Sequence, residues 1–148
     1  MKNNKSFLVG LAGGSASGKT TFIREISKKF EDNQVCVISQ DHYYKGLSEQ
    51  LRDENGIVNF DHPSGIDFAR IKKDIRKLLK GKPVDIVEYT FNNPEIFPKQ
   101  ITYQPAPIIL VEGLFVFADK GLHAMYDCRL YIDADEDVTL DRRLKRDT

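Results

Sequence analysis

The sequence predicts an α/β fold in which a parallel β-sheet is flanked by helices, and two observations support this prediction. Short, continuous apolar runs are typical of parallel strands buried on both faces, and they occur at residues 7–12, 35–39, 108–111 and 129–133. Amphipathic helical patterns separate or follow these runs, at residues 19–30, 67–79 and 135–146. Because strands that alternate with helices form right-handed crossovers, we expect ligands to bind beyond the carboxyl ends of the strands.

Each remaining element has its own sequence signal. The helices over residues 19–30 and 67–79 carry apolar side chains at helical spacing. The second of them is followed by Lys80-Gly81-Lys82-Pro83, which combines the basic, glycine and proline signals of a helix end. The last helix begins acidic and ends basic, as the helix dipole favours. Residues 84–89 indicate a further strand, and residues 100–103 are expected to pair with it as a small hairpin or meander.

The composition indicates one globular domain over residues 1–148, with 41% hydrophobic and 30% charged residues. Lys plus Arg and Asp plus Glu both number 22, so no global basic field exists to hold nucleic acid or an acidic membrane. No apolar stretch approaches the roughly 18 residues of a membrane span, and Phe7–Ala12 is too short for a signal peptide. Cys36 and Cys128 show no metal spacing, so we expect two buried, reduced thiols in a cytoplasmic protein.

A glycine-rich loop between the first strand and the first helix carries the chemistry. It reads Gly13, Gly14, Ser15, Ala16, Ser17, Gly18, Lys19, Thr20 and matches the pattern G-x-x-x-x-G-K-[ST]. Backbone N–H groups and the helix N-terminus favour phosphate there. We expect Lys19 to reach the β- and γ-phosphates of ATP and the Thr20 hydroxyl to ligate Mg²⁺. The motif predicts a P-loop NTPase fold; the alternative is a glycine turn with a solvated lysine.

Three carboxylates are candidates for the rest of the site. Asp41 lies just past the second strand, where it would orient or deprotonate an attacking hydroxyl, or be a turn or cap residue. Glu112 ends the run 108–111 like a Walker-B carboxylate and would hold the hydration shell of Mg²⁺ or bond the P-loop; the alternative is a strand-end glutamate on the surface. Asp61 lies in a proline-stopped loop, where it would accept hydrogen bonds from a diol beside the flat ring of Phe60, or serve as a turn residue.

Basic and aromatic residues leave two interpretations open. The cations of the last predicted helix, among them Arg143 and Arg146, form either a solvated helix end or a lid that clamps phosphates and the acceptor. Tyr89 and Phe91 are either core residues of the hairpin or part of an acceptor pocket. The sequence lacks the guanine motif Asn-Lys-x-Asp and the transporter signature Leu-Ser-Gly-Gly-Gln, which favours a small-molecule kinase.

Several motifs in a fixed order resemble the uridine kinase (uridine–cytidine kinase) family, in the phosphoribulokinase/uridine kinase branch of P-loop kinases. They are the P-loop 13–21, Asp41-His42-Tyr43-Tyr44-Lys45, Asn59-Phe60-Asp61-His62-Pro63, Tyr89-Thr90-Phe91, Val111-Glu112-Gly113 and Arg142-Arg143-Leu144-Lys145-Arg146-Asp147. The resemblance covers essentially the whole chain. It implies transfer of the ATP γ-phosphoryl group to the 5′-hydroxyl of uridine or cytidine with Mg²⁺, a role in pyrimidine salvage and a homo-oligomer.

The resemblance also implies roles for single residues. Asp41 and Lys19 are the implied catalytic residues, and Thr20 with Glu112 the implied metal site. The implied nucleotide-binding residues are the P-loop through Thr21, together with Arg146. The implied acceptor-binding residues form a hairpin-side pocket and a ribose site: Asp41, Tyr44, Phe60, Asp61, Tyr89, Phe91, Asn93 and Arg143.

Two departures from the family pattern keep other functions open. Many members have a histidine three residues after the pocket phenylalanine, where this chain has Pro94, so Asn93 or a different acceptor is the alternative. The sequence also stops at Thr148, within the lid of the family, which leaves strand 129–133 as an exposed edge. The rival hypotheses are a kinase of the same branch with another hydroxylated acceptor, and a nucleotide-binding fragment without catalytic activity.

Overall fold

The computed structural model describes residues 6–13, 18–45, 63–89, 95 and 97–132. Its elements, in chain order, are β1 (Phe7–Ala12), α1 (Lys19–Lys28), β2 (Val35–Ser39), the 3₁₀ turn η1 (Gln40–His42), the 3₁₀ turn η3 (Pro63–Gly65), α2 (Phe68–Leu79), β3 (Val84–Val87), β4 (Gln100–Tyr103), β5 (Ile108–Gly113), α3 (Lys120–Met125) and β6 (Cys128–Tyr131). Among the residues described, no helix is both long enough and apolar enough to cross a membrane.

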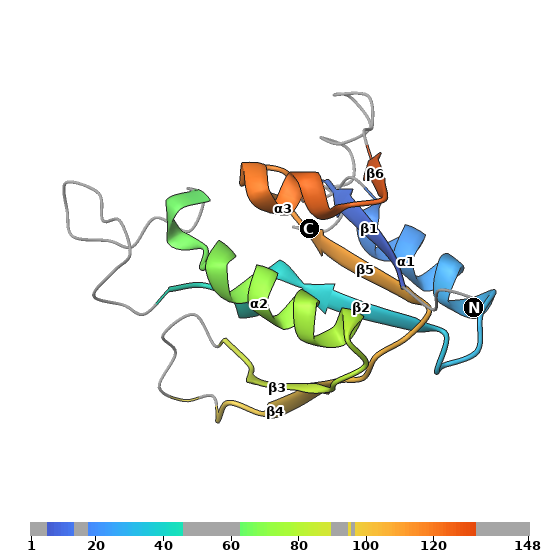
Figure 1. Cartoon of the computed structure of the whole chain (residues 1–148), viewed down its shortest axis with the longest axis horizontal. Helices are drawn as coiled ribbons and strands as arrows, with labels where there is room; N and C mark the ends of the chain where they lie inside the picture. The colour runs from blue at the N-terminus through green and yellow to red at the C-terminus, as the bar shows by residue number, and fades with distance from the viewer. Residues whose placement is uncertain (1–5, 14–17, 46–62, 90–94, 96, 133–148) are drawn as a thin grey trace, which may run out of the picture.

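Four parallel strands form the main sheet, in the order β2-β5-β1-β6 (Figure 1). The register sets Ser39 of β2 opposite Glu112 of β5, and Ala12 of β1 opposite Gly113. The carboxyl ends of these three strands therefore meet at one edge of the sheet. The P-loop follows β1 at this edge and η1 follows β2 there, so the topology brings two predicted parts of the site together.

The two faces of the sheet are covered differently, as the alternation of side chains along each strand requires. Leu8, Ile38 and Ile109 point to the larger core, which α2 and the β3–β4 hairpin complete with residues such as Ile75 and Ile86. The opposite face is covered by the first helix; the residues that pack there are Val9, Leu11 and Leu110 of the sheet and Phe22 and Ile23 of α1. Figure 1 shows α1 on one side of the sheet, with α2 and the hairpin beside β2 on the other.

The predicted pairing of β3 with β4 is confirmed: they form an antiparallel hairpin, with Val84 opposite Tyr103 and Val87 opposite Gln100. Tyr103 joins it to the main sheet, because the Ser39 N–H donates to the Tyr103 hydroxyl at 3.4 Å. Burial raises the pKa of Tyr103 to about 12, so this hydroxyl stays neutral at physiological pH.

The fold class is confirmed, but several predicted boundaries were wrong. Helix α1 ends at Lys28 rather than at residue 30: Lys29 is its C-cap, with its N–H bonded to the Ile26 carbonyl, and Phe30 beyond it is 38% exposed. The strand predicted over 84–89 ends at Val87, although the Glu88 N–H still donates to the Lys99 carbonyl at 2.8 Å. β5 continues beyond residue 111, since Glu112 and Gly113 still pair with neighbouring strands. β6 lies at 128–131 rather than 129–133.

Two further features differ from the sequence analysis, and one predicted helix is not tested. The short helix α3 was not predicted; it begins where the Asp119 side chain accepts a hydrogen bond from the Leu122 N–H at 2.9 Å. Cys36 is buried, but Cys128 is only half-buried, because among the described residues β6 is an edge strand with one neighbour. The helix predicted over 135–146 lies outside the described residues.

Candidate active site

The start of α1 is suited to an anion. Gly18 takes a left-handed conformation (φ 92°) at the N-cap and forms no side-chain cap, and the first turn of α1 holds no acidic residue. The starts of α2 and α3 are instead capped by the side chains of Asp67 and Asp119. Among these three helices α1 thus keeps its first N–H groups free of a carboxylate cap, which is the arrangement that phosphate requires. Gly13 lies at the end of β1, whereas residues 14–17 are outside the described residues.

Lys19 and Glu112 form an ion pair across this edge of the sheet. Lys19 Nζ lies 3.0 Å from Glu112 Oε2, and the two side chains are 19% and 15% exposed. Of the two roles considered for Glu112, the structure therefore contains the one in which it bonds the P-loop lysine. Thr20 and Thr21 lie in the same first helical turn. This set of a hydroxyl, a carboxylate and an ammonium suits a Mg²⁺–phosphate group.

Asp41 belongs to the same electrostatic neighbourhood. Partial removal from water and then the negative charge of Glu112 raise the pKa of Asp41, while Lys19 and His42 act against this shift. Asp41 is nevertheless exposed at the surface of the turn, where an incoming hydroxyl can reach it. Its N–H donates to the Ser39 hydroxyl at 3.3 Å, which caps the turn. The structure therefore brings Asp41, Lys19 and Glu112 together, although they are far apart in the sequence.

The residues on both sides of Asp41 are anchors that the sequence analysis did not identify. Gln40 and Tyr43 are each 1% exposed. The Tyr43 hydroxyl donates to Asp74 Oδ2 of α2 at 2.8 Å, and the Arg70 guanidinium lies 5.7 Å from the centre of the Tyr43 ring. The only sequence signal for Gln40 is a polar residue directly after an apolar strand, which by itself does not distinguish a buried anchor from a surface residue.

Two of the predicted acceptor residues contact each other. The ring centroids of Tyr44 and Tyr89 lie 5.2 Å apart, at an interplanar angle of 36°. Tyr44 is held by a bridge to Ile66, and the Lys45 N–H donates to the Gly65 carbonyl at 2.8 Å. The aromatic pair thus joins the segment after η1 to the end of β3. The other residues predicted to bind the acceptor or the phosphates lie outside the described residues: Phe60, Asp61, Phe91, Asn93, Arg143 and Arg146.

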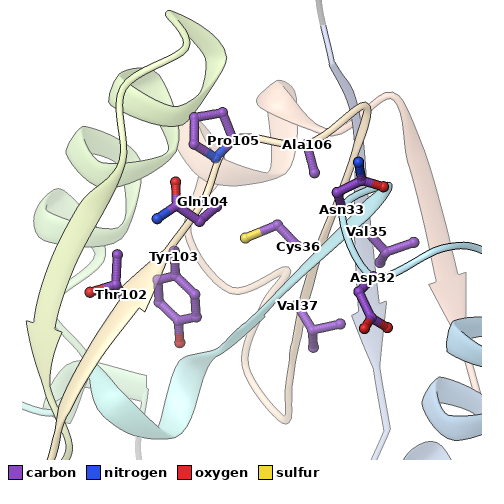
Figure 2. A pocket seen from close by; sticks show the side chains of 10 residues that line it. All are labelled: Asp32, Asn33, Val35, Cys36, Val37, Thr102, Tyr103, Gln104, Pro105 and Ala106. Atoms are coloured by element: carbon purple, nitrogen blue, oxygen red, sulfur yellow. The ribbon is translucent and has the colours of Figure 1, made fainter.

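A separate cavity of about 440 Å³ lies near the start of β2, between that strand and the segment that leads from β4 to β5 (Figure 2). Figure 2 shows Cys36 at its centre, with Asn33 and Gln104 among the polar side chains around it. Burial raises the pKa of the Cys36 thiol to about 11, so this cysteine is a protonated packing residue at neutral pH. Of the predicted site residues that the structure describes, none lines this cavity.

Comparisons with known proteins show the family of this chain. The model of the phosphoribulokinase/uridine kinase family matches residues 8–148. A uridine kinase of Staphylococcus epidermidis is 37% identical over 145 residues, which are 98% of this chain and 70% of that relative.

Solved structures share the fold at lower identity. One described as a possible uridine kinase from Bacillus stearothermophilus has a TM-score of 0.69 at 19% identity, covering 99% of this chain and 80% of that one. A D-glycerate 3-kinase from Cryptococcus neoformans has a TM-score of 0.56 at 13% identity, covering 76% of this chain and 44% of that one. The chain therefore belongs to the phosphoribulokinase/uridine kinase family, and it is a phosphotransferase with the fold of P-loop kinases.

Proposed function

We propose that this kinase transfers the γ-phosphoryl group of ATP to the 5′-hydroxyl of a pyrimidine ribonucleoside, converting uridine or cytidine to UMP or CMP. The observation that carries the proposal is the placement of Asp41 beside the Lys19–Glu112 pair at the phosphate-binding edge of the sheet. The similarity to a uridine kinase over 98% of the chain supports the choice of acceptor.

Each of these residues has a definite task in the proposed reaction. The 5′-oxygen forms a bond to the γ-phosphorus while the bond from that phosphorus to the β–γ bridging oxygen breaks, and ADP leaves. Asp41 accepts the hydrogen bond of the attacking hydroxyl and aligns it, which matters more than basicity in a loose transition state. As the O–P bond forms, the O–H bond breaks and Asp41 takes up the hydroxyl proton. Lys19 and the N–H groups at the start of α1 bind the phosphates. Thr20 and Glu112 would hold Mg²⁺, which neutralises charge on the phosphate oxygens when it is bound.

We assign the acceptor to the side of the site where Tyr44 and Tyr89 meet. An aromatic pair offers a flat apolar surface to a nucleobase. Phe60, Phe91 and Asn93 would complete the base pocket, with Asp61 and Arg143 on the ribose and Arg146 on the phosphates. The Asp61 carboxylate would accept hydrogen bonds from both ribose hydroxyls. With deoxyribose one of these bonds would be missing, so the enzyme would discriminate against deoxyribonucleosides. We place the enzyme in the cytoplasm, as a single domain that forms homo-oligomers.

A second candidate is a kinase with a different hydroxylated acceptor. It is favoured by Pro94, which stands where many uridine kinases have a histidine, and by the D-glycerate 3-kinase that shares the fold.

One experiment separates these candidates. The purified chain is assayed for ATP consumption with uridine, cytidine, deoxyuridine and D-glycerate, and ATP binding is measured on the same sample by calorimetry. Turnover that depends on a ribonucleoside and falls by more than tenfold with deoxyuridine supports the proposal. Turnover with another acceptor alone would favour the second candidate, and ATP binding without any transfer would leave only a nucleotide-binding function. Asp41→Asn is the matched variant: it should bind ATP normally while kcat falls by orders of magnitude.

A further inference from the structure

Gln40 is a fully buried polar residue next to the proposed catalytic aspartate. It directly follows β2, and its side chain is 1% exposed. A buried amide costs free energy unless it is hydrogen-bonded. Its Oε1 accepts a hydrogen bond from the Phe115 N–H at 2.8 Å, in the turn that follows β5. The Gln40 side chain, just after β2, is therefore hydrogen-bonded to the main chain just after β5.

Gly113 is shaped to receive this side chain. A Cβ atom at Gly113 would lie 2.5 Å from Gln40 Cβ and 2.6 Å from Gln40 Oε1. Both distances are shorter than real Cβ contacts, so any other residue at 113 would displace Gln40 or the turn. Gln40 and Gly113 thus form a matched pair, in which the glycine leaves the space that the amide fills.

The position of this pair in the sheet gives it a role. The backbone pairing of β2 with β5 ends at Ser39 opposite Glu112. The residues that follow this last pair are Gln40, just after β2, and Gly113, the last residue of β5. Their contact therefore continues the link between the two segments one residue beyond the backbone pairing. The bond from the Asp41 N–H to the Ser39 hydroxyl is local and does not reach β5.

We infer that the contact of Gln40 with Gly113 and Phe115 is a positioning device, which fixes Asp41 relative to the Lys19–Glu112 pair. Gln40 is next to Asp41 in the sequence, and Gly113 is next to Glu112. If Gln40 moves away from Gly113, the carboxylate of Asp41 therefore moves relative to that of Glu112. The inference rests on the proposed function, because it assigns Gln40 an effect on phosphoryl transfer. Gln40 acts through Asp41 and is a positioning residue rather than a catalytic one.

The test compares variants that disturb this contact from its two sides. Gln40→Met keeps the length of the side chain but removes the acceptor, and Gly113→Ala places a methyl group in the space of Gln40. Tyr126→Phe is the control, because the Tyr126 hydroxyl donates to the Val116 carbonyl at 3.0 Å and holds the same turn without touching Gln40. Steady-state kcat is divided by the number of ATP sites found by calorimetry, so misfolded protein does not count.

We expect Gln40→Met and Gly113→Ala each to lower kcat per ATP site by about 10- to 100-fold, the scale of a small misplacement of reacting groups. Affinity for ATP should change by less than about twofold, because the P-loop is untouched, and Tyr126→Phe should keep kcat per site. The double variant should lose no more kcat per site than the more impaired of the two single variants, since both changes break the same contact. Amide exchange should show a protected Phe115 N–H that loses protection in Gln40→Met.

Three results would overturn the inference. Gln40→Met and Gly113→Ala with wild-type kcat per site would show that the contact does not position Asp41. An equal loss in Tyr126→Phe would show that any loosening of the turn has the same effect. A wild-type chain that transfers no phosphate would refute the proposed function itself, and the inference with it, whereas an active wild type with active variants refutes the inference alone.

Discussion

The buried hydrogen bond from Tyr43 to Asp74 should be one of the main links between the Asp41 turn and the rest of the protein. The Tyr43 hydroxyl lies 2.8 Å from Asp74 Oδ2, and the two residues are 1% and 5% exposed. Burial, followed by the bond to Asp74, raises the pKa of Tyr43, so the hydroxyl remains a donor at neutral pH. Tyr43→Phe removes this donor and leaves a carboxylate that water cannot easily reach.

The magnitude follows from the geometry. A hydrogen bond to a charged group contributes about 1.5–3 kcal/mol, and an acceptor this deeply buried places the loss near the upper end, at about 2–3 kcal/mol. The contact of Arg70 with the ring at 5.7 Å is retained by Phe, so it does not contribute to the difference. We expect the urea midpoint to fall with an unchanged m-value, as for a loss of stability without a change in the surface exposed.

A double-mutant cycle checks this reasoning. Asp74→Leu keeps the branched shape of the aspartate and leaves the Tyr43 hydroxyl without its acceptor, so it should also be destabilising. The combination of Tyr43→Phe with Asp74→Leu removes both polar groups and should be more stable than Tyr43→Phe alone. A coupling free energy below about 0.5 kcal/mol would refute the argument, because it would mean that water replaces the bond in the single variants.

Three further predictions test other parts of the structure. Asp41→Asn should raise Tm at pH 7. The pKa of Asp41 is raised above its ordinary 3.8, so its ionisation costs native stability increasingly as pH rises above 3.8, and in full above the native pKa. The gain in Tm should therefore vanish as pH falls to 3.8, and a gain that persists in acid would contradict this origin. Gly10→Ala should cost about 1–3 kcal/mol in urea denaturation, because its Cβ would lie 2.7 Å from the Phe117 ring. Gly121→Ala is the control, because its Cβ would first meet Lys72 Nζ at 3.0 Å, the far end of a long side chain that can give way more easily than a packed ring. In the native protein about one thiol per chain, that of half-buried Cys128, should react with a disulfide reagent, and Cys36 should react only on unfolding. Fast reaction of both thiols would contradict the burial of Cys36.

The sequence by itself determined the elements that local pattern controls. The strands at 7–12 and 35–39 were predicted with the bounds that the structure has, because short continuous apolar runs favour strands of a sheet buried on both faces. Asp67 was predicted to start α2 and is its N-cap, since capping depends on neighbouring residues only. The P-loop motif predicted the fold class for the same reason, as its glycines and Lys19 act within one strand, loop and helix.

The tertiary structure alone decided which distant groups meet. Nothing near Glu112 in the sequence distinguishes a metal carboxylate from a partner of Lys19, and the order β2-β5-β1 is what brings the two side chains to 3.0 Å. The same order places Gln40 against Gly113, a fit between backbone and side chain that has no periodicity to reveal it. Helix α3 escaped prediction because six residues are too few for a helical pattern, and its start depends on a cap at Asp119 that also pairs with Lys72 of α2. Local patterns indicate where a chain turns and where it forms strands and helices. The chemistry of the site depends on contacts between distant segments, which only the order of strands in the sheet brings together.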